Sequence, residues 1–159
     1  FRLSKRFDYN VHLMIKNPEE WIRKNNYKFD LIIPQFEEVK DVKGYIFFIK
    51  KKKEKVAFAL NPETGIQKIK PYLKEIDYIL ILTVHPGFYG AKFLLEPLQK
   101  IKEIKKINQK IKIIVDGGMN PTTIKVAKKA GADYFVSGSF VSKAENPKKA
   151  MMELEKSIV

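Results

Sequence analysis

The chain has 159 residues, which is enough for one domain with a sizeable core. It contains no cysteine, so disulfides and thiolate metal sites are excluded. No apolar run reaches the roughly 18–20 residues that span a bilayer, and no secretory signal is visible. We therefore expect a cytoplasmic protein without a membrane partner.

The charge balance is strongly basic, with 31 lysines and arginines against 18 acidic residues and a net charge of +13. The excess is mainly lysine, interleaved with isoleucine on apparent amphipathic helices, as at Lys100, Lys102, Lys105 and Lys106. We interpret these lysines as solvated helix faces, and arginine, which suits planar phosphate and base contacts, is scarce. A nucleic-acid-binding module stays open on charge alone, but nucleic acid is not the partner we expect.

Short apolar runs alternate with longer amphipathic segments along the chain. Continuous β-branched runs of this length are typical of parallel strands buried on both faces. The runs are Tyr9–Ile15, Leu31–Phe36, Val56–Leu60, Tyr78–Val84, Ile111–Val115 and Tyr134–Val136.

The connections between these runs are predicted to be helices. Asparagine can cap a helix, and proline fits the first turn because no amide hydrogen is needed there. Four pairs predict helix starts: Asn17-Pro18, Asn61-Pro62, Asn120-Pro121 and Asn146-Pro147. Thr64 and Gln67 suggest a capping box after Pro62, and apolar spacing predicts a helix between Leu94 and Ile107. Gly131 is expected to end the helix that starts at Pro121.

Asp30, Asp77 and Asp133 each stand directly before an apolar run, and we interpret them as structural residues at strand entries. Strand–helix alternation predicts an α/β fold with a parallel sheet. The visible units fit either an open doubly wound sheet or a (β/α)₈ barrel short of two units. Periodicity alone does not choose between these two.

Polar residues at the carboxyl ends of the predicted strands are the candidate functional residues, because barrels place their chemistry there. His12 is either a core residue or an imidazole ligand for a divalent metal. Asp116 follows four apolar residues, and burying its carboxylate requires a partner. Gly117 and Gly118 allow backbone to approach a ligand, so we favour a site over a simple turn.

Two further strand ends suggest a phosphorylated ligand. In the segment 84–93, Gly87 and Gly90 flank aromatic residues, which indicates either a lid with phosphate-binding amides or an ordinary loop. Gly138 and Ser139 follow the last run and offer amide and hydroxyl donors, where barrels often bind phosphate.

Taken in order, these motifs resemble those of the ribulose-phosphate 3-epimerase family over nearly the whole chain. Each motif is weak alone, whereas the ordered set is specific. The matching segments are His12-Leu13-Met14, Leu60-Asn61-Pro62-Glu63-Thr64, Pro86-Gly87-Phe88, Val115-Asp116-Gly117-Gly118, Gly131-Ala132-Asp133 and Gly138-Ser139.

The resemblance implies a (β/α)₈ TIM barrel of the ribulose-phosphate-binding type, here incomplete with about six βα units. We therefore expect residues 1–159 to form a single partial TIM-barrel domain. It also implies interconversion of D-ribulose 5-phosphate and D-xylulose 5-phosphate by proton abstraction and return at C3, with a divalent metal (zinc, iron or manganese) as cofactor. The expected partner is a small-molecule ketose phosphate, and family members often form homo-oligomers.

The resemblance further implies roles for individual residues. His12 and Asp116 would bind the metal, and Asp116 would also be a catalytic acid/base. Substrate and phosphate would be contacted by Met14, Gly87, Phe88, Gly90, Gly117, Gly118, Gly138 and Ser139.

The sequence departs from the family in ways that bear on activity. It lacks the family's first two strands, which carry a substrate-contacting Ser and the His and Asp that complete the metal site and the acid/base pair. Gln35 stands where the family often has His, while Glu37 matches. We therefore expect a fragment of an active enzyme that is inactive alone. The alternatives are a complete, degenerate sugar-phosphate-binding homologue and a hexulose-6-phosphate 3-epimerase.

Overall fold

A computed structural model describes residues 4, 6–25, 29–87 and 91–158 of the chain. A strand forms at each of the six predicted apolar runs, which confirms the strand predictions, and β5 extends one residue beyond its run to Asp116. The strands are β1 (Asn10–Leu13), β2 (Leu31–Pro34), β3 (Ala57–Leu60), β4 (Tyr78–Leu82), β5 (Lys112–Asp116) and β6 (Tyr134–Val136).

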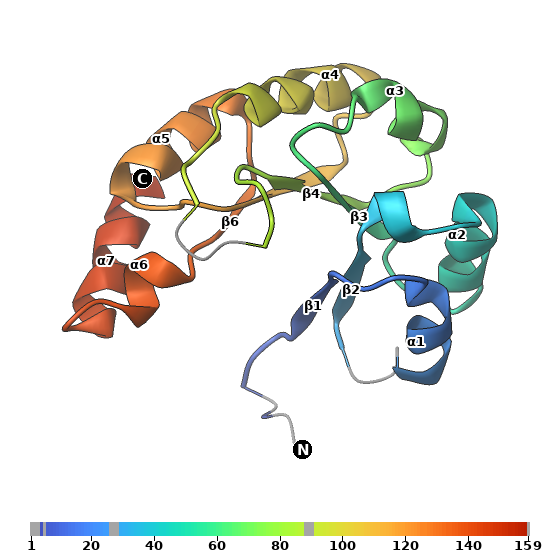
Figure 1. Ribbon diagram of the computed structural model, residues 1–159, viewed down its shortest axis with the longest axis horizontal. Helices are drawn as coiled ribbons and strands as arrows, with labels where there is room; N and C mark the ends of the chain where they lie inside the picture. The colour runs from blue at the N-terminus through green and yellow to red at the C-terminus, as the bar shows by residue number, and fades with distance from the viewer. Residues whose placement is uncertain (1–3, 5, 26–28, 88–90, 159) are drawn as a thin grey trace.

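The strands lie side by side in chain order, and every pairing is parallel. One sheet joins β1 to β2, a second has the order β3-β4-β5-β6, and a bridge between Gln35 and Ala59 connects the two. Figure 1 shows this row inside an arc of helices, with β1 and β6 at its two ends. Sequential order is typical of a barrel, whereas a doubly wound sheet reverses its strand order. Within the described residues, β1 and β6 are not paired with each other, so the ring is open.

The longer helices lie along the outside of this row, where all but the last of them connect one strand to the next (Figure 1). They are α1 (Pro18–Asn25), α2 (Val42–Lys51), α4 (Gln99–Ile107), α5 (Pro121–Ala130) and α7 (Pro147–Ile158). Shorter helical segments are η2 (Phe36–Glu38), α3 (Ile66–Ile69), η3 (Lys70–Tyr72), η4 (Glu96–Leu98) and α6 (Ser139–Ser142). None of the helices in the described part of the chain has the length and apolar character needed to cross a membrane.

Three of the four predicted helix starts are confirmed, at Pro18, Pro121 and Pro147, and α5 ends at Gly131 as predicted. The start at Asn61-Pro62 is wrong, because α3 begins only at Ile66. Thr64 does not cap this helix, since its hydroxyl donates a hydrogen bond to the carboxylate of Glu37. The Thr64 hydroxyl thus bonds to Glu37, which is distant in the sequence, instead of capping α3.

Lys100 corrects the interpretation of the lysines in the α4 segment as uniformly solvated. It is only 9% exposed, and its ammonium donates hydrogen bonds of 2.7 Å to the backbone oxygens of both Asn61 and Pro62. Lys100 lies four residues before the buried Ile104, so the two side chains share one face of the helix. The neighbouring Lys102 is exposed, as predicted.

The strands separate two hydrophobic clusters, because successive side chains of a strand point to opposite faces. The outer cluster packs between strands and helices and includes Phe58 and Ile79. The inner cluster lies on the concave face. Its members are Leu31, Ile33, Ala57, Ala59, Leu80, Leu82 and Ile114, with Tyr78 packed against it.

The aspartates at the strand entries are structural, as predicted, and they make the same contact three times. Each carboxylate accepts a hydrogen bond from the backbone nitrogen of a residue at the start of the preceding strand, and each aspartate's own nitrogen donates back to that residue's oxygen. We call this arrangement an aspartate staple. The staples are Asp30 with Tyr9, Asp77 with Val56, and Asp133 with Ile113.

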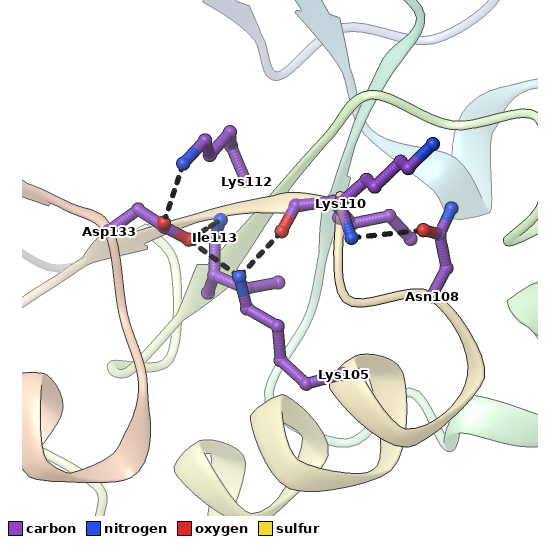
Figure 2. Close-up of polar contacts among 7 residues, drawn as sticks. Lys105, Asn108, Lys110, Lys112, Ile113 and Asp133 are labelled. Carbon is purple, nitrogen blue, oxygen red and sulfur yellow. Dashed lines mark hydrogen bonds and ion pairs between the residues drawn. The ribbon is translucent and has the colours of Figure 1, made fainter.

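Figure 2 shows the Asp133 staple, where two lysines add charge to the hydrogen bonds. The carboxylate lies 2.9 Å from the ammonium of Lys105 and 3.2 Å from that of Lys112. Burial alone would raise the pKa of Asp133, but the hydrogen bond from Ile113 and the two lysines outweigh it and hold that pKa below its usual range. The charged network therefore stabilises the entry end of the sheet.

Candidate functional site

A cavity of about 460 Å³ lies against the concave face of the sheet. His12 and Asp116 both line it, together with apolar side chains of the inner cluster such as Ile33 and Leu80. The cavity is of a size typical for small-molecule sites, and its lining also includes the polar residues Asp8, Asn10, Asp30 and Lys55. The two residues predicted to converge are therefore brought to one cavity from β1 and β5.

Asp116 is the last residue of β5, where it pairs with Leu82 of β4 and Val136 of β6. Burial raises the pKa of its carboxyl group, and the electrostatic influence of His12 opposes that rise. A carboxyl group whose pKa lies above its ordinary value is better matched to proton transfer near neutral pH. The Asp116 carboxyl group thus combines a place in the cavity lining with a raised pKa.

His12 is the third residue of β1 and pairs with Ile33 of β2. Its Nε2 atom lies 2.8 Å from Oε1 of Gln35, which follows β2 directly. This contact ties the candidate imidazole to the next strand along the sheet.

Gln35 belongs to a polar network that the sequence did not reveal. It is 6% exposed, and its Nε2 donates hydrogen bonds of 2.9 Å to Oε2 of Glu37 and to Oδ1 of Asn61. The other oxygen of Glu37 accepts from the Asn61 backbone nitrogen at 3.0 Å and from the Thr64 hydroxyl. One signal was present in the sequence, namely a polar residue directly after a buried strand, the same pattern that marks Asp116.

Lys100 of α4 contacts the same loop, because its ammonium donates hydrogen bonds to the backbone oxygens of Asn61 and Pro62. Burial lowers the pKa of its ammonium, while the charges of Glu37 and Glu63 act in the opposite direction. The loop after β3 is therefore held between two polar groups, the Gln35 amide and the Lys100 ammonium.

The turn after Asp116 requires glycine for steric reasons. Gly117 has φ of 119°, and a Cβ atom there would lie 2.7 Å from Cγ2 and 3.0 Å from the backbone nitrogen of Val84. Gly118 has φ of 65°, and its Cβ would lie 3.0 Å from Cβ of Phe93. Both glycines are needed to bring these segments together, with or without a bound ligand.

Thr83 positions the end of β5 and was also missed by sequence reasoning. It is fully buried, its nitrogen donates to Asp116 O at 2.8 Å, and its hydroxyl donates to Gly117 O at 2.7 Å. The sequence feature that could have identified it is its position directly after β4, since it follows Leu82, the residue that pairs with Asp116. Thr83 thus fixes the backbone that carries the candidate acid/base.

The remaining predicted residues lie at the rim or beyond the described chain. Met14 follows β1 and is 57% exposed, outside the cavity lining. Gly87 is exposed, whereas Phe88 and Gly90 lie outside the described residues.

Gly138 and Ser139 follow β6, at the start of α6. The hydroxyl of the adjacent Ser137 donates to Met119 O at 3.0 Å, which ties this loop to the turn after β5. The exits of β5 and β6 are therefore joined at the predicted phosphate region.

The donor types of His12 and Asp116 suit a divalent metal, but their number falls short. Within the described residues there is no group of three or more His, Cys, Asp or Glu side chains that could hold a metal ion. Catalytic zinc usually has three protein ligands. Two ligands are an incomplete set, so the geometry of the described chain assigns no reaction step to a metal.

Parallel strands in chain order, helices outside them and polar strand ends around a cavity define a protein of the (β/α)-barrel class. Solved barrel enzymes agree with this fold. Orotidine 5'-phosphate decarboxylase from Pyrococcus horikoshii matches with a TM-score of 0.63 and 18% identity, covering 95% of this chain and 74% of that one. KGPDC from Streptococcus mutans matches with a TM-score of 0.60 and 15% identity, covering 89% and 66%.

Within this class, the chain belongs to the ribulose-phosphate 3 epimerase family, whose family model matches residues 2–142. Named ribulose-phosphate 3-epimerases are similar to it. The Bacillus subtilis protein is 35% identical over 151 residues, covering 91% of this chain and 70% of the relative. The cytoplasmic isoform of Oryza sativa is 30% identical, covering 94% and 68%, and the Methanocaldococcus jannaschii protein is 35% identical, covering 91% and 63%. The resemblance seen in the sequence is confirmed, and the chain is a member of an isomerase family.

Proposed function

We propose that the chain is part of a metal-dependent 3-epimerase that interconverts D-ribulose 5-phosphate and D-xylulose 5-phosphate. The observation that carries this proposal is the shared cavity of His12 and Asp116 in a chain of this family. The raised pKa of the Asp116 carboxyl group supports a role in proton transfer.

In this proposal Asp116 removes the proton from C3 of the sugar, which leaves an ene-diolate, or returns a proton to it in the reverse direction. Inversion at C3 requires a second acid on the opposite face. The other carboxylates that line the cavity, Asp8 and Asp30, belong to the strand-entry end. We therefore propose that the second acid comes from outside the described residues.

The phosphate group is proposed to lie at the joined exits of β5 and β6. The backbone amides of Gly117, Gly118 and Gly138 and the side chain of Ser139 are the proposed donors. Gly118 and Gly138 are exposed, which supports ligand access. Met14 below the substrate and Gly87, Phe88 and Gly90 in a lid complete the proposed binding residues.

The proposed cofactor is a divalent metal, either zinc, iron or manganese. Such an ion supplies Lewis-acid stabilisation to a developing oxyanion. His12 and Asp116 would be two of its ligands, and further ligands would have to come from outside the described residues. A cytoplasmic location and homo-oligomeric assembly belong to the same proposal.

A second candidate function is non-catalytic binding of a sugar phosphate. It is favoured by one observation: among the described residues that line the cavity, Asp116 is the one acid at the strand exits. In that case the glycine-rich exits bind the ligand while no second group completes the epimerisation.

The proposal is tested by an epimerase assay with added zinc, iron or manganese, on this chain and on a chimera. The chimera carries the first two strand–helix units of the Bacillus subtilis relative at its N-terminus. We expect no turnover by the chain alone, metal-dependent turnover by the chimera, and its loss in Asp116→Asn. Asp41→Asn is the matched control, because Asp41 caps α2 and asparagine caps equally well.

Two results would count against this proposal. A folded chimera that binds ketose phosphate without turning it over would favour the non-catalytic function. Turnover that survives Asp116→Asn would remove Asp116 from the proposed acid/base role.

A further inference from the structure

The side-chain amide of Gln35 contacts three segments at the exits of the first three strands. It meets His12 on β1, Glu37 in η2 and Asn61 directly after β3. An amide offers an acceptor oxygen on one side and a donor NH₂ group on the other. Its orientation therefore determines which hydrogen-bonding role each neighbour must play.

Glu37 fixes that orientation. Its carboxylate can only accept hydrogen bonds, and its Oε2 lies 2.9 Å from Gln35 Nε2, so this side of the amide must be the NH₂ group. Asn61 Oδ1, also at 2.9 Å, accepts the second hydrogen. Glu37 itself is held in place by the Asn61 backbone nitrogen and the Thr64 hydroxyl. The amide oxygen of Gln35 is consequently directed toward His12.

That oxygen is an acceptor and lies 2.8 Å from His12 Nε2, so Nε2 must carry a hydrogen. A neutral imidazole has one protonated nitrogen, which leaves the lone pair on Nδ1. We propose that Gln35 is a positioning residue that holds neutral His12 as the Nε2-protonated tautomer and keeps Nδ1 as its acceptor atom.

This tautomer has a consequence that rests on the proposed function. If His12 is a metal ligand, Nδ1 is the atom that binds the ion. The hydrogen bond between His12 Nε2 and Gln35 Oε1 then orients the ring. Hydrogen bonds of this kind to the second ring nitrogen fix the orientation and basicity of ligating imidazoles. The tautomer itself can be measured without a metal or a substrate.

The first measurement is the long-range ¹H–¹⁵N spectrum of the full chain with ¹⁵N-labelled histidine at about pH 8.5, above the usual range for imidazole protonation. The chain has two histidines, so His85→Asn removes the other one and assigns the His12 signals. We expect a protonated Nε2 and an unprotonated Nδ1. A His12 ring protonated on Nδ1 would overturn the proposal without any change at Gln35.

The second measurement repeats the spectrum with Gln35→Met, which keeps the side-chain length and removes the amide. We expect the single tautomer to become a mixture. Gln67→Met, at an exposed glutamine in α3, should leave the His12 signals unchanged. A folded Gln35→Met chain with the wild-type tautomer would also overturn the proposal.

Glu37→Gln provides an independent test if Gln35→Met does not fold, because it removes the acceptor-only anchor and allows the Gln35 amide to turn. A mixture of tautomers is expected, with Glu38→Gln as the control at the next carboxyl group. An unchanged tautomer in folded Glu37→Gln would show that Glu37 does not set the orientation and would contradict the argument.

Zinc titration followed in the same spectra separates this inference from the proposed function. Zinc should shift Nδ1 rather than Nε2, and Gln35→Met should bind it about 10–100-fold more weakly. A shift at Nε2 would overturn the tautomer assignment. A wild-type chain that binds no zinc would show that His12 and Asp116 alone do not hold the ion, while the metal-free spectrum would still decide the tautomer.

Discussion

Asp133 and Ile113 form two hydrogen bonds with each other, and these bonds join the entry ends of β5 and β6. The carboxylate of Asp133 accepts from Ile113 N at 2.8 Å, and Asp133 N donates to Ile113 O at 2.9 Å. The aspartate staples at Asp30 and Asp77 join β1 to β2 and β3 to β4 in the same way. The strands are thus stapled in consecutive pairs at their entry ends.

Replacing Asp133 with asparagine should destabilise the chain by about 1–3 kcal/mol, because charged hydrogen bonds to Lys105, Lys112 and the backbone are weakened. Urea unfolding measures the loss. Asp41→Asn is the matched control and should stay within about 0.5 kcal/mol, since asparagine also caps helices. Equal stability of the two variants would mean that the charge of Asp133 contributes nothing.

The pH dependence of the same variant has a defined sign. The folded-state pKa of Asp133 lies below its usual range, so the stabilisation is present above the unfolded-state pKa and is lost as pH falls through the folded-state pKa. The stability difference between wild type and Asp133→Asn should therefore shrink in the acid range. A difference that is constant down to acid pH would contradict the assignment.

Asp116→Asn should stabilise the chain at neutral pH while removing the proposed proton transfer. Burial raises the folded-state pKa of Asp116, so wild-type stability falls as pH rises from the unfolded-state pKa through the folded-state pKa. Asparagine does not ionise, so the variant lacks this decrease in stability with rising pH. Thermal unfolding at several pH values measures the effect, and a variant less stable than wild type at neutral pH would refute the expectation.

Lys100→Met should lower stability by about 1–3 kcal/mol, because the backbone oxygens of Asn61 and Pro62 lose their donor inside the protein. Lys102→Met, at an exposed position of α4, should change stability by no more than about 0.5 kcal/mol. Denaturation of the two variants side by side checks this. Similar values for both would show that the buried ammonium is replaceable by an apolar chain.

Gly117→Ala should destabilise the chain by about 1–3 kcal/mol, since its φ of 119° and the close approach of Val84 both disfavour a Cβ atom. Gly65→Ala is the contrast. Gly65 has φ of −70°, and no neighbouring atom lies within 4 Å of where its Cβ would be, so alanine should be neutral or stabilise by about 0.4–1 kcal/mol. Calorimetry of both variants decides whether the strain is real.

The strands and most helix starts could be predicted because their signals are local. Runs such as Ile111–Val115 report burial on both faces, and the pair Asn120-Pro121 carries its own cap and first turn. The start at Asn61-Pro62 and the environment of Lys100 could not be predicted. Both depend on partners from distant segments, the Glu37 carboxylate for Thr64 and the loop after β3 for Lys100.

In the candidate site, too, the residues with local signals could be predicted and those that depend on distant partners could not. His12 and Asp116 were identified because each is a polar residue near the end of an apolar run, and parallel strands bring such ends together. The contacts of Gln35 and Thr83 depend on strand register, which a single sequence does not specify. Their residue types were visible, but their partners were not.

The bridge between Gln35 and Ala59 connects the two-stranded sheet that carries His12 to the four-stranded sheet that carries Asp116. A junction this narrow makes β1 and β2 the segment expected to open first by local unfolding, with its backbone amides exchanging faster than those of β4 and β5. A ligand that contacts both His12 and Asp116 would bind only the closed arrangement. Its binding should slow hydrogen exchange in β1 and β2. The affinity for the ligand and the free energy of opening β1 and β2 are then thermodynamically linked.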